Sequence, residues 1–552
     1  MTERPWLAAY PEGVPARIDP DQYASLKALL EESFARNGEA PALENLGVVL
    51  SYAETERLSR QVAAYFQSRG DFSPGDRVAV MMPNLLQYPV AVFGLLRAGL
   101  TVVNVNPLYT PRELEHQLKD SGARAIIVLE NFAATVEAVI DRVDLDLVIV
   151  TRIGDHLPRL RGWVTNFIVK RIKKLVPGWR IPGTVSYLEV LQLGERQAYA
   201  DIEVEPEDIA FLQYTGGTTG LSKGAMLTHR NMVSNVLQAV AWARPAQLGA
   251  SDRAATPLPL YHIFSLTANL LCFIELGGTN MLITNPRDLT SVVKDLKRAP
   301  VSYLTGVNTL FNALLQLPSF REVDFGRLKV AMGGGMAVQR SVAEAWQRIT
   351  GKPLAQGYGL TEASPIVSAN PLDATSFSES IGLPLPSTEI SIHDDDGRPL
   401  AANQTGEICV SGPQVMKGYW NDAAATAEVM LPGGWLRTGD IGRMDGDGFL
   451  FIEDRRKDLI IVSGFNVYPN ELENVASMHP GVLEAAAVGV PDERSGEAIR
   501  LFVVRKDASL TEAELIEFFR RQVTGYKVPD QVVFRDELPK TNVGKVLRRA
   551  LR

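Results

Sequence analysis

The sequence of 552 residues predicts an α/β protein that ends in a smaller α+β unit. Strand and helix patterns alternate over residues 50–130 and again over residues 208–382, which is typical of a parallel sheet with helices on its faces. Residues 389–451 instead hold short apolar runs between Gly, Pro and Asp, as in a small antiparallel β-unit. A polar stretch at 454–458 then precedes a final segment of about 95 residues.

The individual elements follow from local periodicity. In the first α/β stretch, residues 77–82, 101–105 and 125–129 read as short buried strands. Residues 55–67, 85–98 and 112–120 place apolar side chains at helical spacing between them. In the β-unit, the runs EISIH, GEICV and GFLFIE are the expected strands.

Composition excludes several classes of protein. Apolar residues make up 46% of the chain and charged residues 22%, as in an ordinary globular protein. The net charge of −8 argues against attraction of the whole surface to nucleic acid. Only Cys272 and Cys409 are present, which excludes a disulfide framework or a cysteine-based metal site and suits a reducing cytoplasm. Residues 85–105 and 263–276 are too polar or too short to span a membrane, so no integral membrane protein is expected.

A phosphate-binding loop is predicted at residues 214–224, YTGGTTGLSKG, which follow an apolar run. Glycines let backbone N–H groups surround phosphate oxygens, hydroxyls donate to them, and a lysine adds positive charge. The loop is not a Walker A motif, because Lys223 follows Ser222 instead of preceding a Ser or Thr. A flexible surface turn is the alternative. The residues expected to bind phosphate are Thr215, Gly216, Gly217, Thr218, Thr219, Gly220 and Lys223.

This loop resembles that of the adenylate-forming enzymes, which include acyl-CoA synthetases, luciferases and peptide-synthetase adenylation domains. Ser222 and Gly217 replace a usual proline and serine, as in bacterial long-chain fatty acid–CoA ligases, the group that the chain resembles most closely. The resemblance extends from residues 104–110 to residues 539–545. It implies an N-terminal domain over 1–456, with two stacked α/β subdomains (about 1–200 and 201–385) and a β-barrel-like subdomain (386–456). A small mobile α+β domain over 457–552 follows, with its hinge at Lys457.

Two glycine-containing motifs are expected to hold the nucleotide. Gly333, Gly334 and Gly335 follow a strand-like run and allow close approach to a flat ring, although a plain turn is the alternative. Family members place adenine against this segment. The second motif is QGYGLTEA at 356–363, with Gly357 and Gly359 on either side of an aromatic residue.

Polar and aromatic side chains add specific contacts. Tyr358 can stack on adenine, Thr361 can donate to the α-phosphate, and Glu362 can hold Mg²⁺. The resemblance also implies Thr218 as a magnesium ligand. Asp440 can accept hydrogen bonds from both ribose hydroxyls, and the resemblance implies that Arg455 contacts the ribose.

The residues expected to bind the acyl group and CoA are identified mainly from the resemblance. By residue type, His262 in PLPLYHIF reads as a histidine satisfied within a buried turn, whereas the family places it beside the acyl carboxylate. No acidic residue stands between Asp252 and Glu275, which disfavours an amino-acid substrate. The family lysine, Lys545, reaches the carboxylate and α-phosphate during adenylation. Gly464 corresponds to a loop that lines the pantetheine tunnel after the C-terminal domain rotates.

Together these features predict an AMP-forming ligase that activates long-chain fatty acids for fatty acid degradation or lipid use. ATP and a fatty carboxylate would give acyl-adenylate and pyrophosphate, and CoA would then displace AMP. Mg²⁺ is the expected metal, and relatives suggest a homodimer. Ligases of medium-chain or aryl carboxylates, and fatty acyl-AMP ligases, are the alternatives.

Residues 156–188 form a basic segment with seven cations and no Asp or Glu. Projected as a helix, Val164, Ile168, Ile172, Leu175 and Val176 share one arc, and Lys170, Lys173 and Lys174 lie opposite. Such a pattern fits a helix on an anionic membrane surface, although a helix packed on its own protein fits as well. We expect a cytoplasmic protein with peripheral contact to the inner membrane through residues 158–180.

Overall fold

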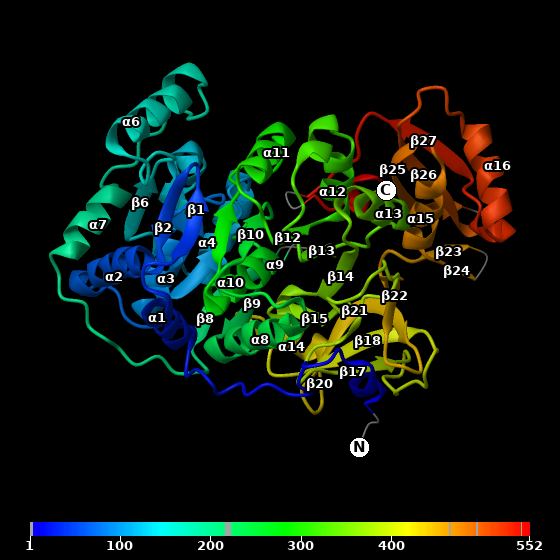
Figure 1. The fold of residues 1–552 in the computed structure, drawn as a ribbon, viewed down its shortest axis with the longest axis horizontal. Helices are drawn as coiled ribbons and strands as arrows, with labels where there is room; N and C mark the ends of the chain where they lie inside the picture. The colour runs from blue at the N-terminus through cyan, green and yellow to red at the C-terminus, as the bar shows by residue number, and fades with distance from the viewer. Residues whose placement is uncertain (1–3, 216–221, 463–464, 493–494, 542–543) are drawn as a thin grey trace.

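The computed structural model describes residues 4–215, 222–462, 465–492, 495–541 and 544–552. A broad body and a smaller C-terminal unit lie side by side (Figure 1). The predicted α/β class, with a large N-terminal part and a small C-terminal α+β part, is confirmed. All six elements expected over residues 55–129 are present, as α2 (Tyr52–Arg69), β3 (Arg77–Met81), α3 (Gln87–Arg97), β4 (Thr101–Asn104), α4 (Pro111–Ser121) and β5 (Ala125–Leu129).

The first large sheet is parallel in its centre and antiparallel at one edge. Its strands, in spatial order, are β19 (Gly418–Tyr419), β9 (Lys223–Thr228), β8 (Ile209–Thr215), β4 (Thr101–Asn104), β3 (Arg77–Met81), β5 (Ala125–Leu129), β6 (Leu147–Thr151) and β7 (Val185–Ser186).

The second large sheet has the same mixed character. Its strands, in spatial order, are β16 (Leu383–Pro384), β15 (Ile366–Ala369), β14 (Leu354–Gly359), β13 (Val330–Gly334), β12 (Tyr303–Gly306), β10 (Arg253–Thr256), β11 (Thr279–Leu282), β1 (Pro41–Asn45) and β2 (Val48–Ser51).

The chain exchanges strands between these two sheets. The N-terminal strand β1 pairs with β11 of the second sheet, and β8 pairs with β4 of the first. A subdomain limit near residue 200 therefore does not coincide with a division between the sheets. Hydrogen bonding between strands that are far apart in sequence decides this arrangement. Local sequence patterns do not predict such pairing.

Two smaller sheets follow. The antiparallel sheet of the expected β-unit contains β17 (Glu389–His393), β18 (Gly406–Ser411), β21 (Trp435–Met444), β20 (Met430–Leu431) and β22 (Leu450–Arg455). The sheet of the C-terminal unit contains β24 (Phe465–Val467), β23 (Ile460–Val462), β26 (Gly496–Arg505), β25 (Val482–Asp492) and β27 (Gln531–Arg535).

Helices cover these sheets and fill the space between them. In the body they are α1 (Leu26–Asn37), α2 (Tyr52–Arg69), α3 (Gln87–Arg97), α4 (Pro111–Ser121), α5 (Ala133–Glu137), α6 (Arg159–Phe167), α7 (Tyr187–Glu195), α8 (His229–Trp242), α9 (Ile263–Ser265), α10 (Cys272–Leu276), α11 (Leu289–Arg298), α12 (Asn308–Leu315), α13 (Arg340–Thr350) and α14 (Ala423–Val429). The C-terminal unit adds α15 (Pro469–Met478) and α16 (Glu512–Gln522).

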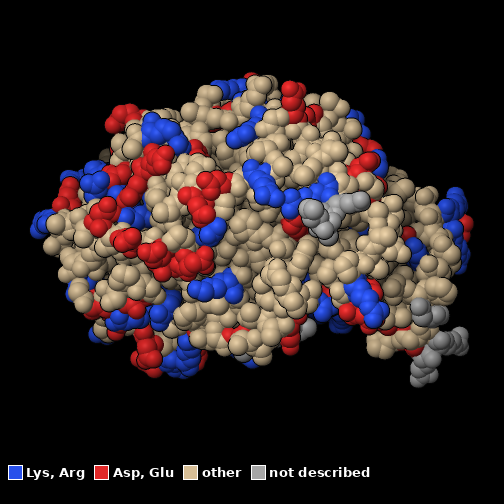
Figure 2. Space-filling model, turned by 90° about the horizontal axis from the view of Figure 1, so that it is seen from below, with Lys and Arg blue, Asp and Glu red and all other residues tan. Residues whose placement is uncertain are grey.

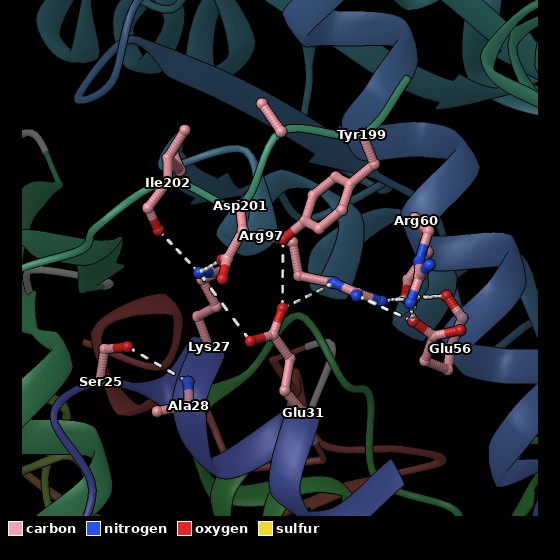
Figure 3. Close-up of polar contacts among 12 residues, drawn as sticks. Ser25, Lys27, Ala28, Glu31, Glu56, Arg60, Arg97, Tyr199, Asp201 and Ile202 are labelled. Carbon is pink, nitrogen blue, oxygen red and sulfur yellow. Dashed lines mark hydrogen bonds and ion pairs between the residues drawn. The ribbon is translucent and has the colours of Figure 1, made fainter. Parts of the chain in front are cut away.

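Helix α3 lies at the centre of the core and is buried on every side. Its sequence is apolar all round, as expected of a helix with no face toward water. Its last residue, Arg97, is buried and pairs with Glu56 at 2.9 Å and Glu31 at 3.3 Å, with its guanidinium over the Tyr199 ring (Figure 3). This cluster joins α1, α2 and α3 to the segment that leads toward β8.

The basic segment departs from the predicted helix. Helix α6 continues only through a π-helical turn at Ile168–Ile172, so the expected arc through Leu175 and Val176 is wrong. Lys174 has a φ of 51°, a left-handed conformation that stops a right-handed helix. Lys170 is not a free cation, because its Nζ lies 2.7 Å from Glu130 Oε1.

Charges are mixed on the surface in Figure 2, where Lys and Arg alternate with Asp and Glu. On the face shown, the net charge of −8 is therefore not gathered in one patch. Within the described ranges, every helix is too short or too polar to cross a bilayer.

Candidate functional site

The residues named by the sequence motifs converge where the second large sheet, the β21–β22 hairpin and the C-terminal segment meet. Tyr358 comes from β14, Asp440 from β21 and Arg455 from β22. Lys545 comes from the segment at the end of the chain. Contacts among these side chains, described below, bring together parts of the chain that are far apart in sequence.

The predicted phosphate loop connects β8 to β9. Thr215 and Lys223 face each other across this hairpin, whereas Gly216, Gly217, Thr218, Thr219 and Gly220 lie outside the described residues. Lys223 Nζ lies 3.7 Å from Asp422 Oδ2 and 5.4 Å from the centre of the Tyr419 ring. His116 Nε2 donates to the carbonyl of Ser222 at 2.9 Å, which ties the loop to α4.

Asp440 is a buried carboxylate with two polar partners, the buried Tyr358 and the half-exposed Arg455. Tyr358 donates its hydroxyl to Asp440 Oδ2 at 2.7 Å, and Arg455 Nε lies 3.2 Å from Asp440 Oδ1. Burial and the Asp440 charge hold the pKa of Tyr358 well above its ordinary value, so the phenol stays a donor. The ring of Tyr358 is thereby fixed beside a carboxylate that retains lone pairs for further donors.

Glu362 is held by a tyrosine that the motifs did not single out. Tyr419, in β19, donates to Glu362 Oε1 at 2.6 Å. Burial and Glu362 together raise the pKa of Tyr419, which keeps this hydroxyl protonated. Thr361 and Glu362 share the 3₁₀ turn Thr361–Ala363 that follows β14.

No cluster of three His, Cys, Asp or Glu side chains that could hold a metal ion occurs within the described residues. Mg²⁺ does not require one, because it usually binds through one or two carboxylates and substrate phosphates. The single carboxylate of Glu362, fixed by Tyr419, fits that mode of binding.

The glycines of the two nucleotide motifs stand where a side chain has no room. A Cβ on Gly334 would lie 2.9 Å from the Phe264 ring, and one on Gly333 would lie 2.3 Å from Val338 Cγ2. Gly335 has a φ of +75°, and a Cβ there would lie 3.1 Å from Lys545 Cε. Lys545 thus extends directly over the end of β13.

The same close packing applies to the second motif. A Cβ on Gly359 would lie 2.0 Å from the carbonyl oxygen of Pro365, and one on Gly357 would lie 3.3 Å from Met332 Sδ. These glycines are therefore required by the close approach of the protein's own backbone and side chains to this strand.

Lys545 is anchored in this position by its own segment. Its amide donates to Thr541 Oγ1 at 3.0 Å, and Thr309 of α12 donates to the carbonyl of Gly544 at 3.1 Å. Burial and the charge of Arg455 lower the pKa of Lys545 to about 8, against the opposing effects of Asp440 and Glu362. The Lys545 amine is therefore mostly protonated at neutral pH, but it loses its proton at a lower pH than an ordinary lysine does.

His262 caps the short helix α9, where its Nδ1 accepts from the amide of Phe264 at 3.3 Å. Burial and the Lys545 charge lower the pKa of His262 to about 3. The imidazole is therefore neutral at neutral pH. Because Nδ1 is the acceptor, Nε2 carries the hydrogen and can donate to an anion.

The remaining predicted residues have different outcomes. Lys457 lies in the turn directly after β22, and its carbonyl accepts from Arg552 at 3.4 Å. Gly464 lies outside the described residues. Arg548, three residues after Lys545, pairs with Glu473 at 2.9 Å and Asp454 at 3.3 Å, which holds the end of the chain against the C-terminal unit.

Known proteins share both the sequence and the fold. The AMP-binding enzyme family model matches residues 30–420, and the model of the AMP-binding enzyme C-terminal domain matches residues 471–545. A long-chain fatty acid–CoA ligase of Escherichia coli is 57% identical, over 99% of this chain and 97% of that protein. One from Haemophilus influenzae is 52% identical, over 100% and 98%.

A solved structure agrees with the fold. ATP-bound MatB from Rhodopseudomonas palustris superimposes with a TM-score of 0.82 at 28% identity, over 96% of this chain and 98% of that one. The matches cover both the body and the C-terminal unit, in which the site residues described above are found. The chain therefore belongs to the AMP-binding enzyme family of adenylate-forming ligases and groups there with the bacterial long-chain fatty acid–CoA ligases.

Proposed function

We propose that this protein activates long-chain fatty acids to acyl-CoA in two steps, with ATP and CoA as co-substrates. The observation that carries the proposal is the position of Lys545 against Gly335, beside the Tyr358–Asp440–Arg455 group. The extensive similarity to long-chain fatty acid–CoA ligases supports the acyl substrate.

In the first step the fatty carboxylate attacks the α-phosphorus of ATP. It needs no general base, because a carboxylic acid is already ionised at pH 7. The barrier is the approach of two anions, so the Lys545 ammonium at the end of β13 supplies electrostatic stabilisation. His262 is neutral and orients the carboxylate through its Nε2 hydrogen without adding charge.

We assign nucleotide binding to the polar group formed by Tyr358, Asp440 and Arg455. Asp440 receives the ribose hydroxyls, with Arg455 beside it, and Tyr358 packs against the adenine. Thr361 donates to the α-phosphate. Glu362 would hold Mg²⁺, together with Thr218 of the phosphate loop, and the ion would neutralise charge on the ATP phosphates.

The second step requires a different face of the C-terminal unit. Rotation about Lys457, in the turn after β22, withdraws Lys545 and brings the segment of Gly464 to the site. The CoA thiol then displaces AMP from the acyl-adenylate. One site thus performs two half-reactions with two sets of residues.

The test separates the half-reactions. Lys545→Ala should abolish ATP–pyrophosphate exchange and still convert supplied acyl-adenylate to acyl-CoA. Lys540→Ala is the matched control, because Lys540 lies in the same segment but pairs with Glu484 at 2.7 Å. Equal loss of both half-reactions in Lys545→Ala would contradict the division of labour.

A substrate panel tests the acyl specificity. CoA-dependent AMP release, measured with acetate, octanoate, palmitate, oleate and coumarate, should be fastest with the long chains. Faster turnover of coumarate or octanoate would favour an aryl or medium-chain ligase. Adenylate formation without CoA-dependent release would favour a fatty acyl-AMP ligase. Sedimentation of the full chain would test the expected homodimer.

We further propose that α6 docks on an anionic membrane surface. Its outer side exposes an apolar stripe at helical spacing, formed by Leu160, Trp163, Val164 and Phe167, and the Trp163 and Phe167 rings stack at 5.7 Å. The helix stands out from the body in Figure 1. Its inner side is fixed by Asn166, which accepts from the amide of Gly154 at 2.8 Å.

Basic residues beside the stripe favour an anionic lipid surface. Lys173 and Lys174 are exposed and follow the exposed Ile172. Apolar side chains that enter the interface, together with flanking cations, are the mark of a peripheral helix. This position would place the enzyme where free fatty acid enters the cytoplasm.

Liposome co-sedimentation tests this contact. Trp163→Ser and Lys173→Gln/Lys174→Gln should each weaken binding to vesicles that contain phosphatidylglycerol. Leu188→Ser, at an exposed leucine of α7, should leave it unchanged. Binding that ignores both the lipid charge and these substitutions would contradict the proposed docking.

A further inference from the structure

The turn that carries His262 is held by buried side chains from other parts of the chain. It runs over residues 257–262, between β10 and α9, and we call it the histidine turn. Asn84, which lies between β3 and α3, binds its backbone twice. Its Nδ2 donates to the carbonyl of Leu258 at 2.9 Å, and its Oδ1 accepts from the amide of Leu260 at 2.8 Å.

Gln213 holds the same turn from the other large sheet. It lies in β8, and its Nε2 donates to the carbonyl of Tyr261 at 2.8 Å. Tyr261 directly precedes His262, and Gln213 stands two residues before Thr215, which is expected to bind phosphate. One side chain therefore connects the strand that leads to the phosphate side of the site with the turn that leads to the carboxylate side.

Asn104, the last residue of β4, sets the direction of the Gln213 amide. Its Nδ2 donates to Gln213 Oε1 at 3.0 Å, which leaves the Gln213 Nε2 directed at the histidine turn. The Tyr88 hydroxyl lies 2.6 Å from Asn104 Oδ1 and 2.9 Å from the carbonyl of Leu260. The side chains of Asn84, Tyr88, Asn104 and Gln213 are at most 5% exposed. A buried network whose polar groups are paired is rigid.

We propose that Gln213 and Asn104 are positioning residues that hold the histidine turn in register with the end of β8. The inference rests on the proposed function, because it takes His262 to orient the carboxylate and Thr215 to meet the phosphates. Attack needs the carboxylate oxygen about 3–3.5 Å from the α-phosphorus, and a misplacement of about 1 Å can cost about 100-fold in rate. Segments of two different sheets meet that tolerance when they are fixed to each other, as Gln213 fixes these two.

Rates and affinities of the full chain separate positioning from binding. Gln213→Met removes the amide and keeps the length of the side chain, so kcat for ATP–pyrophosphate exchange with palmitate should fall about 10- to 100-fold. The Kd values for α,β-methylene-ATP and for palmitate, measured separately by calorimetry, should each change less than about 2-fold, since each ligand keeps its own contacts. Conversion of supplied palmitoyl-adenylate to palmitoyl-CoA should change as little, because its acyl–phosphate bond is already formed.

A double-mutant cycle tests whether Gln213 acts through His262. His262→Ala should itself slow adenylation, and adding Gln213→Met should slow it less than about 3-fold further, because the placement of an absent imidazole no longer matters. Tyr88→Phe removes one hydroxyl from the same network and should lower kcat about 3- to 10-fold. Gln87→Met is the matched control, since Gln87 is also buried and donates to the carbonyl of Arg152 at 2.8 Å, and it should leave adenylation unchanged.

The outcomes distinguish the inference from the proposed function. Additive effects in the cycle, or equal loss of both half-reactions and of both affinities in Gln213→Met, would overturn the positioning role. If Gln213→Met does not fold, the cycle of Tyr88→Phe with His262→Ala decides by the same criterion. If the unchanged protein does not adenylate palmitate, the proposed acyl substrate is wrong. The cycle is then measured with the acid that the protein does adenylate, and it decides the positioning role independently.

Discussion

The pH dependence of adenylation is the most direct test of the assignment of Lys545. Its pKa is lowered to about 8, first by burial and then by the charge of Arg455. With that pKa, roughly nine-tenths of the side chains are charged at pH 7 and roughly one-tenth at pH 9. If the ammonium stabilises the transition state, kcat/KM for adenylation should be nearly constant below pH 7. Above pH 8 it should fall toward about 10-fold per unit.

Lys545→Arg removes this titration and keeps the charge, because a guanidinium stays protonated over the whole pH range of the assay. Its absolute rate should drop, since the side chain next to Gly335 is larger, but its profile should stay flat to about pH 10. Initial rates of ATP–pyrophosphate exchange measure this, with Lys540→Arg as the control that retains the inflection. An inflection near pH 8 that survives in Lys545→Arg would assign it to another group and refute the reasoning.

Three further substitutions test the site and the core. Tyr419→Phe removes the 2.6 Å hydrogen bond to Glu362, so adenylation kcat/KM should fall about 10- to 100-fold, most at low Mg²⁺. Gly335→Ala combines a φ of +75° with a Cβ 3.1 Å from Lys545 Cε, and should slow adenylation at least about 10-fold and spare the conversion of supplied acyl-adenylate. Arg97→Met removes the buried partner of Glu31 and Glu56, which keep Lys27 and Arg60 respectively, and should lower the free energy of unfolding in urea by about 1–3 kcal/mol.

Each of these has a result that would count against it. A Tyr419→Phe enzyme with unchanged magnesium dependence would remove the link between that tyrosine and metal binding. Equal damage to both half-reactions in Gly335→Ala would indicate a general folding defect. An unchanged urea midpoint in Arg97→Met would mean that the carboxylates find other partners or water.

The sequence predicted local elements well and long-range pairing poorly. Strands β3, β4 and β5 and the helices between them were expected, because buried strands and amphipathic helices have strong periodicity. Nothing local indicated that β1 would pair with β11 across the body. The early end of the α6 helix depends on the left-handed conformation of Lys174, which is unusual for a residue other than glycine.

For the candidate site, the motifs predicted the residues that are expected to contact the substrates. They did not predict all of the residues that hold those side chains in place. Tyr358 and Asp440 were each expected to meet the nucleotide, yet their mutual hydrogen bond appears only in the fold. Tyr419 was missed, because a tyrosine after a Gly carries no chemical signal of its own. Thr309 was missed for a similar reason, since its role is to hold the backbone of Gly544.

The exchange of strands between the two large sheets bears on how the chain is made. The ribosome releases the β1–β2 hairpin long before β11, although Leu43 is paired with Asn280 in the finished sheet. Until then one edge of β1 has unpaired backbone groups, which are prone to pair with other chains. Closing so long a loop is also slow. The nascent enzyme therefore passes through a stage in which its first strands need protection, and chaperones that cover exposed edges should raise its yield.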